Sequence, residues 1–280
     1  MSAARATELR DAELRADCTV DAHGRITFGL RLDSAVHPQL LLRLRPKKGQ
    51  PEQVVHLIDL EPAEDGRRRA VLDSEPALAE GRWDAYLLRE PGEERLRLRP
   101  GLRDQRTLVD GHTRDRSSPV AVRIPYATKD GYLAVRAWLR TAHSEAGAID
   151  VTDRSMTVAA RLHGASLGEG AAVLLRRRGE AGVVQTLEPR AGGDGRDFSF
   201  TVDHQELAAA GGTGSGSGIW DVFLQPAEGA PRVRVGRLLD DLADRKEIFV
   251  YPAATVGGVT LRPYYTVDND LSVAVTRTPS

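Results

Sequence analysis

Apolar and polar residues alternate along many short segments of this chain, and a period of two predicts β-strands with one buried face. In residues 25–32 the apolar side chains of Ile26, Phe28, Leu30 and Leu32 fall on one face. The second half of the chain repeats this pattern with Met156, Val158, Ala160 and Leu162. Further strands are predicted at 39–45, 53–60, 68–73, 82–88, 94–99, 120–125, 132–139, 171–177, 182–187, 197–203, 219–225, 231–235, 247–251, 258–265 and 270–276.

The predicted strands are short and are bounded by Gly, Pro and Asp, without helical patterns of 10 to 15 residues between them. This arrangement favours antiparallel β-sandwiches over a parallel α/β sheet, so the expected fold class is all-β. Residues 3–17 are expected to form a short helix or frayed leader, because Ala, Glu, Leu and Arg favour helices. The glycine-rich stretch 211–218 is expected to form a mobile loop.

Two motifs occur twice, and their spacing indicates a tandem repeat. Gly81-Arg82-Trp83-Asp84 returns as Gly218-Ile219-Trp220-Asp221, and Pro125-Tyr126 returns as Pro263-Tyr264. Trp83 and Trp220 are 137 residues apart, and Tyr126 and Tyr264 are 138 apart. This period is too long for a solenoid unit and fits a globular domain. We expect two domains, 1–143 and 144–280, joined by a short polar linker within 141–148.

The segment Leu78-Ala79-Glu80-Gly81-Arg82-Trp83 resembles the aromatic corner of immunoglobulin-like domains. The resemblance implies two tandem immunoglobulin-like antiparallel β-sandwiches that arose by internal duplication. In that family the aromatic side chain packs beneath a corner between the sheets. Trp83 and Trp220 are therefore expected to be core residues.

Composition narrows the function classes. Charged residues make up 28% of the 280 residues, but the formal net charge is −1, so we expect no nucleic-acid partner. No segment reaches the 18 apolar residues of a membrane span, and the start of the chain lacks a signal-peptide pattern. A single cysteine, Cys18, suits a reducing compartment and is expected to be structural. The expected location is the cytoplasm.

Motifs for catalysis, metals and cofactors are weak. Asp268-Asn269-Asp270 matches a metal-binding Asp-x-Asp signature, but the corresponding Asp130-Gly131-Tyr132 keeps only the first Asp. That difference favours a β-turn over a metal site. The seven histidines show no metal-ligand spacing, and no phosphate loop or nucleophile elbow is present. The sequence predicts no catalytic residue, no metal and no cofactor.

Alternating arginines form the leading candidate for a binding surface. Arg95 and Arg97 in the first half correspond to Arg232 and Arg234 in the second, and alternation places each pair on one strand face. Guanidinium groups bind phosphate and carboxylate well. A solvated outer face has the same pattern, so both interpretations stay open, and in either case we expect the four arginines to point into solvent. Tyr264 and Tyr265 complete the candidate ligand-binding residues.

The Trp-Asp strand, the Arg-Val-Arg-Val strand, Arg262-Pro263-Tyr264-Tyr265-Thr266 and the final Leu271-Ser272-Val273 strand resemble tandem immunoglobulin-like accessory modules of bacterial glycosyltransferases and teichoic-acid-type polymerases. The resemblance implies a non-catalytic module that binds a carbohydrate or an anionic polymer, or that assists assembly beside a glycosyltransferase. A protein-interaction scaffold and a small-molecule biosynthetic enzyme with a cleft between the sandwiches are the alternatives. A glycan, a transferase and a second copy of the chain are the partners considered.

Overall fold

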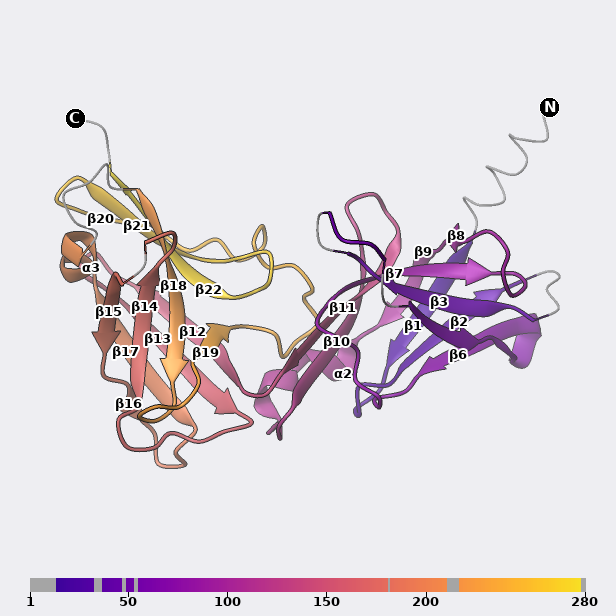
Figure 1. Cartoon of the computed structure of the whole chain (residues 1–280), viewed down its shortest axis with the longest axis horizontal. Coiled ribbons are helices and arrows are strands. Elements are labelled where there is room, and N and C mark those ends of the chain that lie inside the picture. The colour runs from indigo at the N-terminus through magenta and orange to yellow at the C-terminus, as the bar shows by residue number, and fades with distance from the viewer. Residues whose placement is uncertain are drawn as a thin grey trace. The chain divides into compact units, whose positions relative to one another are not determined.

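The computed structural model describes residues 14–32, 37–46, 49–52, 55–180, 182–210 and 217–277. These residues are mostly β-strand, and the strands are mostly antiparallel (Figure 1), which confirms a predominantly β chain. Residues 3–13 of the predicted leader and residues 211–216 of the predicted loop lie outside the described residues.

The chain divides into two compact units. The first comprises residues 1–111 and 121–139, and the second comprises 112–120 and 140–280. The chain therefore passes between the units three times.

The first unit contains two sheets. The strand order of one is β5-β6-β2-β1-β9, and that of the other is β10-β11-β7-β3-β4, with β8 also paired to β7. The strands are β1 Arg15–Val20, β2 Ile26–Arg31, β3 Gln39–Leu44, β4 Val55–Asp59, β5 Glu61–Pro62, β6 Arg67–Leu72, β7 Gly81–Leu88, β8 Leu96–Arg97, β9 Arg99–Asp104, β10 Val120–Ala127 and β11 Leu133–Arg140. The short helices of this unit are η1 Glu64–Gly66 and α2 Arg106–Val109, and η2 Gly111–Thr113 lies where the chain passes into the second unit.

The second unit is built on one continuous sheet. Its order is β16-β17-β13-β12-β19-β18-β22-β21-β20, and β14 joins through β18 and also pairs with β15. The strands are β12 His143–Val151, β13 Ser155–His163, β14 Ala172–Arg177, β15 Val184–Leu187, β16 Arg190–Ala191, β17 Asp197–Asp203, β18 Gly218–Gln225, β19 Val233–Gly236, β20 Ala254–Val256, β21 Val259–Tyr265 and β22 Leu271–Arg277. The helix α3 spans His204–Ala210.

Strand pairing follows the same order in both units. The series β5-β6-β2-β1-β9 corresponds to β16-β17-β13-β12-β19, and β11-β7-β3-β4 corresponds to β22-β18-β14-β15. The correspondence extends to strand direction, because β1 pairs parallel with β9 and β12 pairs parallel with β19. The immunoglobulin-like assignment and the duplication themselves stay predictions.

The repeated Gly-x-Trp motif has a packing reason in each unit. Trp83 and Trp220 are both buried, which confirms the predicted core role. Two residues before them, a Cβ on Gly81 would lie 2.5 Å from Leu44 Cδ1, and a Cβ on Gly218 would lie 2.8 Å from Arg177 Nε. Leu44 and Arg177 hold corresponding places, since each lies opposite the tryptophan of its unit. In both units a side chain at this position would therefore crowd a side chain of the neighbouring strand, which would have to shift to make room.

The second unit encloses its core between two groups of strands. Phe198, Phe200 and Val158 come from one group, and Trp220, Val222 and Leu261 come from the other. These side chains form one buried cluster, as expected for sheets packed face to face.

Three predictions about individual segments were wrong. The polar segment 141–148 is no linker, because residues 143–151 form β12, where the polar side chains His143, Ser144 and Glu145 are buried. Residues 15–17 belong to a strand, not to a helix. Residues 247–251 form no strand: Ile248 ends a turn, Val250 follows in irregular structure, and both side chains are exposed. The strand β12 was missed because its buried side chains are polar, and the strand prediction relied on alternating apolar and polar residues.

We predict that Trp220→Ala lowers the free energy of unfolding by about 3 to 5 kcal/mol, because it empties the largest side-chain site in this core. Urea denaturation followed by tryptophan fluorescence measures the change. The control is Val250→Ala, an exposed position where about 0.5 kcal/mol or less is expected. Equal effects of the two substitutions would contradict the core role of Trp220.

Candidate functional site

The aspartate of the Trp-Asp motif is the centre of an arginine cluster in the first unit. The Asp84 side chain is only 4% exposed, and it accepts hydrogen bonds from three arginines. The shortest nitrogen–oxygen distances are 3.0 Å from Arg43, 2.6 Å from Arg45 and 3.4 Å from Arg97. Arg43 and Arg45 come from β3 and the residue just beyond it, and Arg97 comes from β8.

Asp221 has the same place in the second unit. It lies 2.6 Å from Arg178 and 3.4 Å from Arg234, and it accepts a hydrogen bond of 2.8 Å from the Ser272 hydroxyl. Arg234 lies opposite Phe223 in the β18–β19 register, as Arg97 lies opposite Tyr86 in the β7–β8 register.

Both carboxylates stay ionised to low pH. Burial alone would raise the pKa of Asp84, but the hydrogen bonds from Arg45 and Arg43 outweigh it and hold the pKa below its ordinary value. At Asp221 burial also opposes ionisation, and Arg178 and Arg234 lower the pKa in the same way. Each cluster is a partly buried ion network that joins neighbouring strands.

Two of the predicted binding arginines therefore belong to these networks. We expected Arg97 and Arg234 to point into solvent, and that expectation is wrong: their side chains are 32% and 19% exposed and are paired with carboxylates. Each also stacks on aromatic rings, with Arg97 3.9 Å from the Tyr132 ring centre and Arg234 4.7 Å from that of Phe223. Desolvated aspartates draw the arginines inward.

The other predicted residues differ in environment. Arg95 is exposed and pairs with Glu52 at 2.7 Å. Tyr265 is fully buried among Phe249 and Tyr251, and burial raises the pKa of its hydroxyl, so it is a core residue and not a surface contact. Tyr264 is half-buried on β21. Arg232 is exposed, and among the described residues it has no hydrogen-bond or ion-pair partner.

Arg232 and Arg234 meet at a cavity of about 590 Å³ in the second unit, which we call the arginine cavity. Arg140 also lines it, together with Thr141 and Ser166, and the rest of the wall is mainly Ala, Gly, Pro and Val. Two of the three arginines that line this cavity, Arg232 and Arg234, are among the candidate binding residues of the sequence analysis. Arg140 was missed because it ends β11, about 90 residues before β19.

Asp270 orients two of these arginines. One carboxylate oxygen lies 3.0 Å from Arg140 and the other lies 3.4 Å from Arg234. Asp270 is held by a turn in which Asn269 has a φ of 61° and the Thr266 N–H bonds to the Asp270 carbonyl. The turn predicted for 268–270 is confirmed, and the Asp270 side chain forms ion pairs with Arg140 and Arg234.

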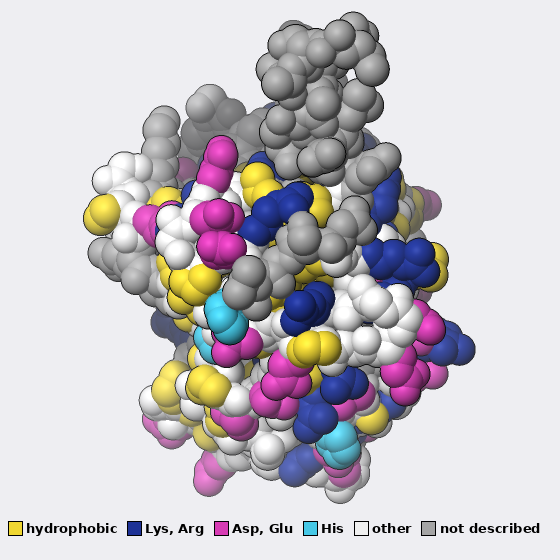
Figure 2. All heavy atoms as spheres, turned by 90° about the vertical axis from the view of Figure 1, so that its right-hand side faces the viewer, with side chains coloured by type: hydrophobic (Ala, Val, Ile, Leu, Met, Phe, Trp, Pro, Cys, Tyr) yellow, Lys and Arg dark blue, Asp and Glu magenta, His cyan; other side chains and the backbone are white. Residues whose placement is uncertain are grey.

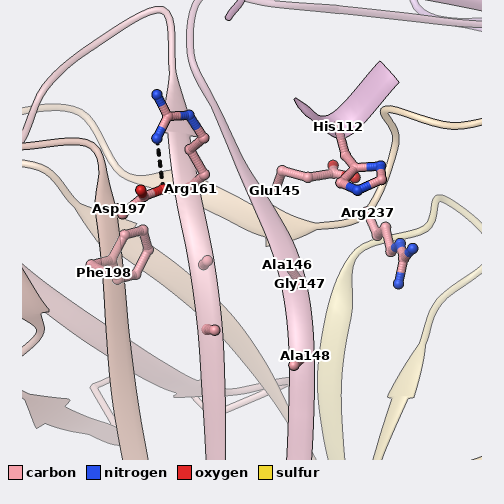
Figure 3. A pocket seen from close by; sticks show the side chains of 11 residues that line it. His112, Glu145, Ala146, Gly147, Ala148, Arg161, Asp197, Phe198 and Arg237 are labelled. Atoms are coloured by element: carbon pink, nitrogen blue, oxygen red, sulfur yellow. Dashed lines mark hydrogen bonds and ion pairs between the residues drawn. The ribbon is translucent and has the colours of Figure 1, made fainter. Parts of the chain in front are cut away.

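A second cavity, of about 490 Å³, opens over β12, β13 and β17 (Figure 3). Glu145 extends from β12 toward His112 and Arg237, while Arg161 and Asp197 face each other across 2.7 Å. Its floor consists largely of alanine and glycine. Arg161 is paired with Asp197, Arg237 with Asp240, and Glu145 with His143, so each of these charges already has a partner.

Glu145 is the most buried carboxylate of this second cavity. Its oxygens accept hydrogen bonds from the backbone N–H groups of Leu238, at 2.7 Å, and Leu239, at 3.2 Å, and one oxygen lies 2.8 Å from His143 Nε2. Burial would raise its pKa, but the His143 contact and the two N–H groups hold it below the ordinary value. Sequence analysis missed Glu145 because it assigned this segment to a linker.

The remaining candidates for chemistry are limited. Among the described residues, no group of three or more His, Cys, Asp and Glu side chains is arranged to hold a metal ion. Cys18 is buried, and burial raises the pKa of its thiol to about 12, which fits the predicted structural role.

On the face shown in Figure 2, acidic and basic side chains are interspersed. In the part of the chain that the structure describes, no helix is long and apolar enough to span a membrane.

Comparison with known proteins gives distant structural similarity only. No protein-family model matches the chain, and no curated protein matches it. S. aureus TarS aligns with a TM-score of 0.30 and 14% identity over 67% of this chain and 35% of TarS. A structure of S. aureus TarS residues 217–571 aligns with a TM-score of 0.29 and 14% identity over 70% of this chain and 58% of that fragment. The matches thus cover about a third and over half of those two chains.

We predict that Asp84→Asn lowers the free energy of unfolding by about 2 to 3 kcal/mol, because three arginines lose the charge that they enclose. Chemical denaturation at pH 7 measures the difference. Asp104→Asn is the matched control, since Asp104 pairs with Arg106 at the surface, where solvent screens the pair, and the substitution should change stability far less than Asp84→Asn does. An Asp84→Asn protein as stable as the control would show that the cluster contributes little.

Proposed function

We propose that this chain is a non-catalytic module that binds an anionic polymer or glycan through the arginine cavity, in association with a glycosyltransferase. The observation that carries the proposal is the convergence of Arg140, Arg232 and Arg234 on one cavity. Arg232 supports it most, since this exposed guanidinium has no partner within the described part of the chain.

The local charge favours an anion. Arg140 and Arg234 share the single carboxylate of Asp270 at the cavity, while Asp221 is divided between Arg234 and Arg178. Arg232 therefore adds positive charge that no described carboxylate balances. Guanidinium groups donate paired hydrogen bonds to phosphate or carboxylate oxygens, and a cavity of this volume falls in the range of small-molecule sites.

The lining of the cavity favours a ligand with a carbon skeleton over a bare ion. Ala142, Ala165, Ala227 and Pro231 supply apolar wall, and Thr141 and Ser166 bring hydroxyl groups to the same cavity. Mixed lining of this kind suits one acidic sugar or polyol unit of a longer polymer. A polymer presents such units repeatedly, which raises the effective concentration at a single site.

The architecture supports a module with a binding role. We propose that the two units are duplicated immunoglobulin-like sandwiches, because their strands pair in the same order and direction. The binding surface is assigned to the second unit. In the first, Arg95 and Arg97 are held by Glu52 and Asp84. The cytoplasm is retained as the proposed location.

One observation favours the alternative of a protein-interaction scaffold. The apolar side chains of Ile248, Val250 and Val267 are each more than half exposed in the second unit. Exposed apolar groups of this kind are common at protein contacts when they adjoin one another. The experiment below separates the two functions, because a glycan site depends on Arg232 and a contact through these residues does not.

We predict that the wild-type chain binds a phosphate-bearing wall polymer and that Arg232→Ala weakens binding about tenfold, the loss expected for one charge-assisted contact. Isothermal calorimetry in about 50 mM and about 500 mM salt measures the Kd, which should rise with salt as exposed charges are screened.

Arg190→Ala is the control, because it removes the same charge from an exposed position on β16 and should leave the Kd unchanged. Neutral dextran is the control ligand. An equal rise in Kd for Arg232→Ala and Arg190→Ala would show that binding depends on net charge and not on the arginine cavity. Absence of binding by the wild type would refute the proposal.

A further inference from the structure

Two buried histidines of the second unit lie side by side on neighbouring strands. His143 on β12 pairs across the strands with His163 on β13, and both side chains are fully buried. His143 uses Nε2 to contact Glu145 at 2.8 Å. Both ring nitrogens of His163 lack a hydrogen-bond partner among the described residues. A neutral imidazole with no acceptor nearby is poorly prepared to take up a proton.

The segment 112–120, which we call the strap, is fastened to β13 next to these histidines. The Gly164 N–H, immediately after His163, donates to the Arg116 carbonyl at 3.0 Å. Arg161, two residues before His163, holds the Asp115 carboxylate at 2.8 Å, and Arg196 lies 3.3 Å from the other oxygen. Both contacts thus adjoin His163, whose ring nitrogens have no hydrogen-bond partner among the described residues.

Protonation of this cluster is opposed from several sides. Burial, and next the charge of His143, lower the pKa of His163 to about 4 from an ordinary 6.5. Charged groups reach the cluster from every neighbouring element: Glu145 on β12, Arg161 on β13, Asp115 and Arg116 on the strap, and Arg245 in the loop after β19. At Glu145 burial would raise the pKa, but the His143 contact and two backbone N–H groups outweigh it and lower the pKa, and the hydrogen bond from Arg161 lowers the pKa of Asp115, so both carboxylates favour the ionised form.

We propose that the strap is an acid-released clasp: it is fastened to β13 at neutral pH and detaches when the buried histidine beside it takes up a proton. The state with the strap detached exposes His163 to water and restores its ordinary proton affinity. The attached state cannot bind that proton until the pH approaches 4.

The direction of the pH effect follows from that difference. Below pH 6.5 the detached state binds more protons than the attached state, so acidification favours detachment. For one proton, the equilibrium constant for detachment rises about tenfold per pH unit between pH 6.5 and about 4. Above pH 6.5 both states are neutral at His163 and the strap stays fastened. Since His112 of the strap and its anchor Arg161 line the second cavity, detachment also opens that cavity.

Hydrogen–deuterium exchange on the full chain tests the clasp. After correction for the intrinsic pH dependence of exchange, amide exchange of the strap and of Gly164 should accelerate about tenfold per pH unit from 6.5 to 4.5, relative to β7 of the first unit. His163→Leu removes the titrating group without removing a described hydrogen bond, so the acceleration should disappear. His163→Gln, which keeps a polar side chain, is the second variant if the first does not fold.

Two controls fix the interpretation. His23→Leu removes an exposed histidine in the first unit and should keep the wild-type profile. Arg161→Gln removes the anchor of Asp115 and should raise strap exchange already at pH 7. A wild-type profile that is flat between pH 6.5 and 4.5 overturns the proposal, as does an unchanged acceleration in a folded His163 variant.

Discussion

Each unit removes one aspartate from water in the strand that carries its tryptophan, and the surrounding structure must supply positive charge to that carboxylate. An unpaired carboxylate in such a place costs several kcal/mol, whereas a paired and hydrogen-bonded one is tolerated. Asp84 gathers Arg43 and Arg45 from β3 and the residue just beyond it, and Arg97 from β8, while Asp221 gathers Arg178 and Arg234. Each network therefore joins the strand that carries the Trp-Asp motif to neighbouring strands, and this gives a physical reason for repeating Trp-Asp together with alternating arginines.

This constraint also explains where prediction from sequence succeeded and failed. Alternation located β2 and β13, and the repeated Gly-x-Trp motif correctly identified Trp83 and Trp220 as core residues. The arginines were ambiguous, because a solvated ladder and an ion network share one sequence pattern. Partners such as Asp84 and Arg97 are fixed by strand pairing, which local sequence does not specify. Likewise β12 escaped detection because its buried residues are polar, and their partners lie on β13 and in the segment after β19.

The arginines available to bind a ligand are those that Asp84 and Asp221 do not hold. Once the arginines that serve Asp84 and Asp221 are set aside, Arg232 is the member of the predicted set that is exposed and unpaired within the described residues. Its cavity and the one around Glu145 differ in electrostatic character. In the arginine cavity Asp270 pairs with Arg140 and Arg234, and Arg232 adds a charge that no described carboxylate balances, whereas Arg161 and Asp197 neutralise each other in the second. The first therefore suits an anionic ligand, and the second adjoins the buried histidines and the strap.

The central claim is that the aspartates of the repeated motif are ionised and held by arginine. The most direct measurement is the ¹³C chemical shift of the Asp84 and Asp221 side-chain carboxyl carbons, followed by NMR as the pH is lowered from 7. The account predicts that both midpoints lie below the ordinary aspartate value of 3.8 in the folded protein. Midpoints at or above 3.8 would contradict it, because burial would then outweigh the arginines.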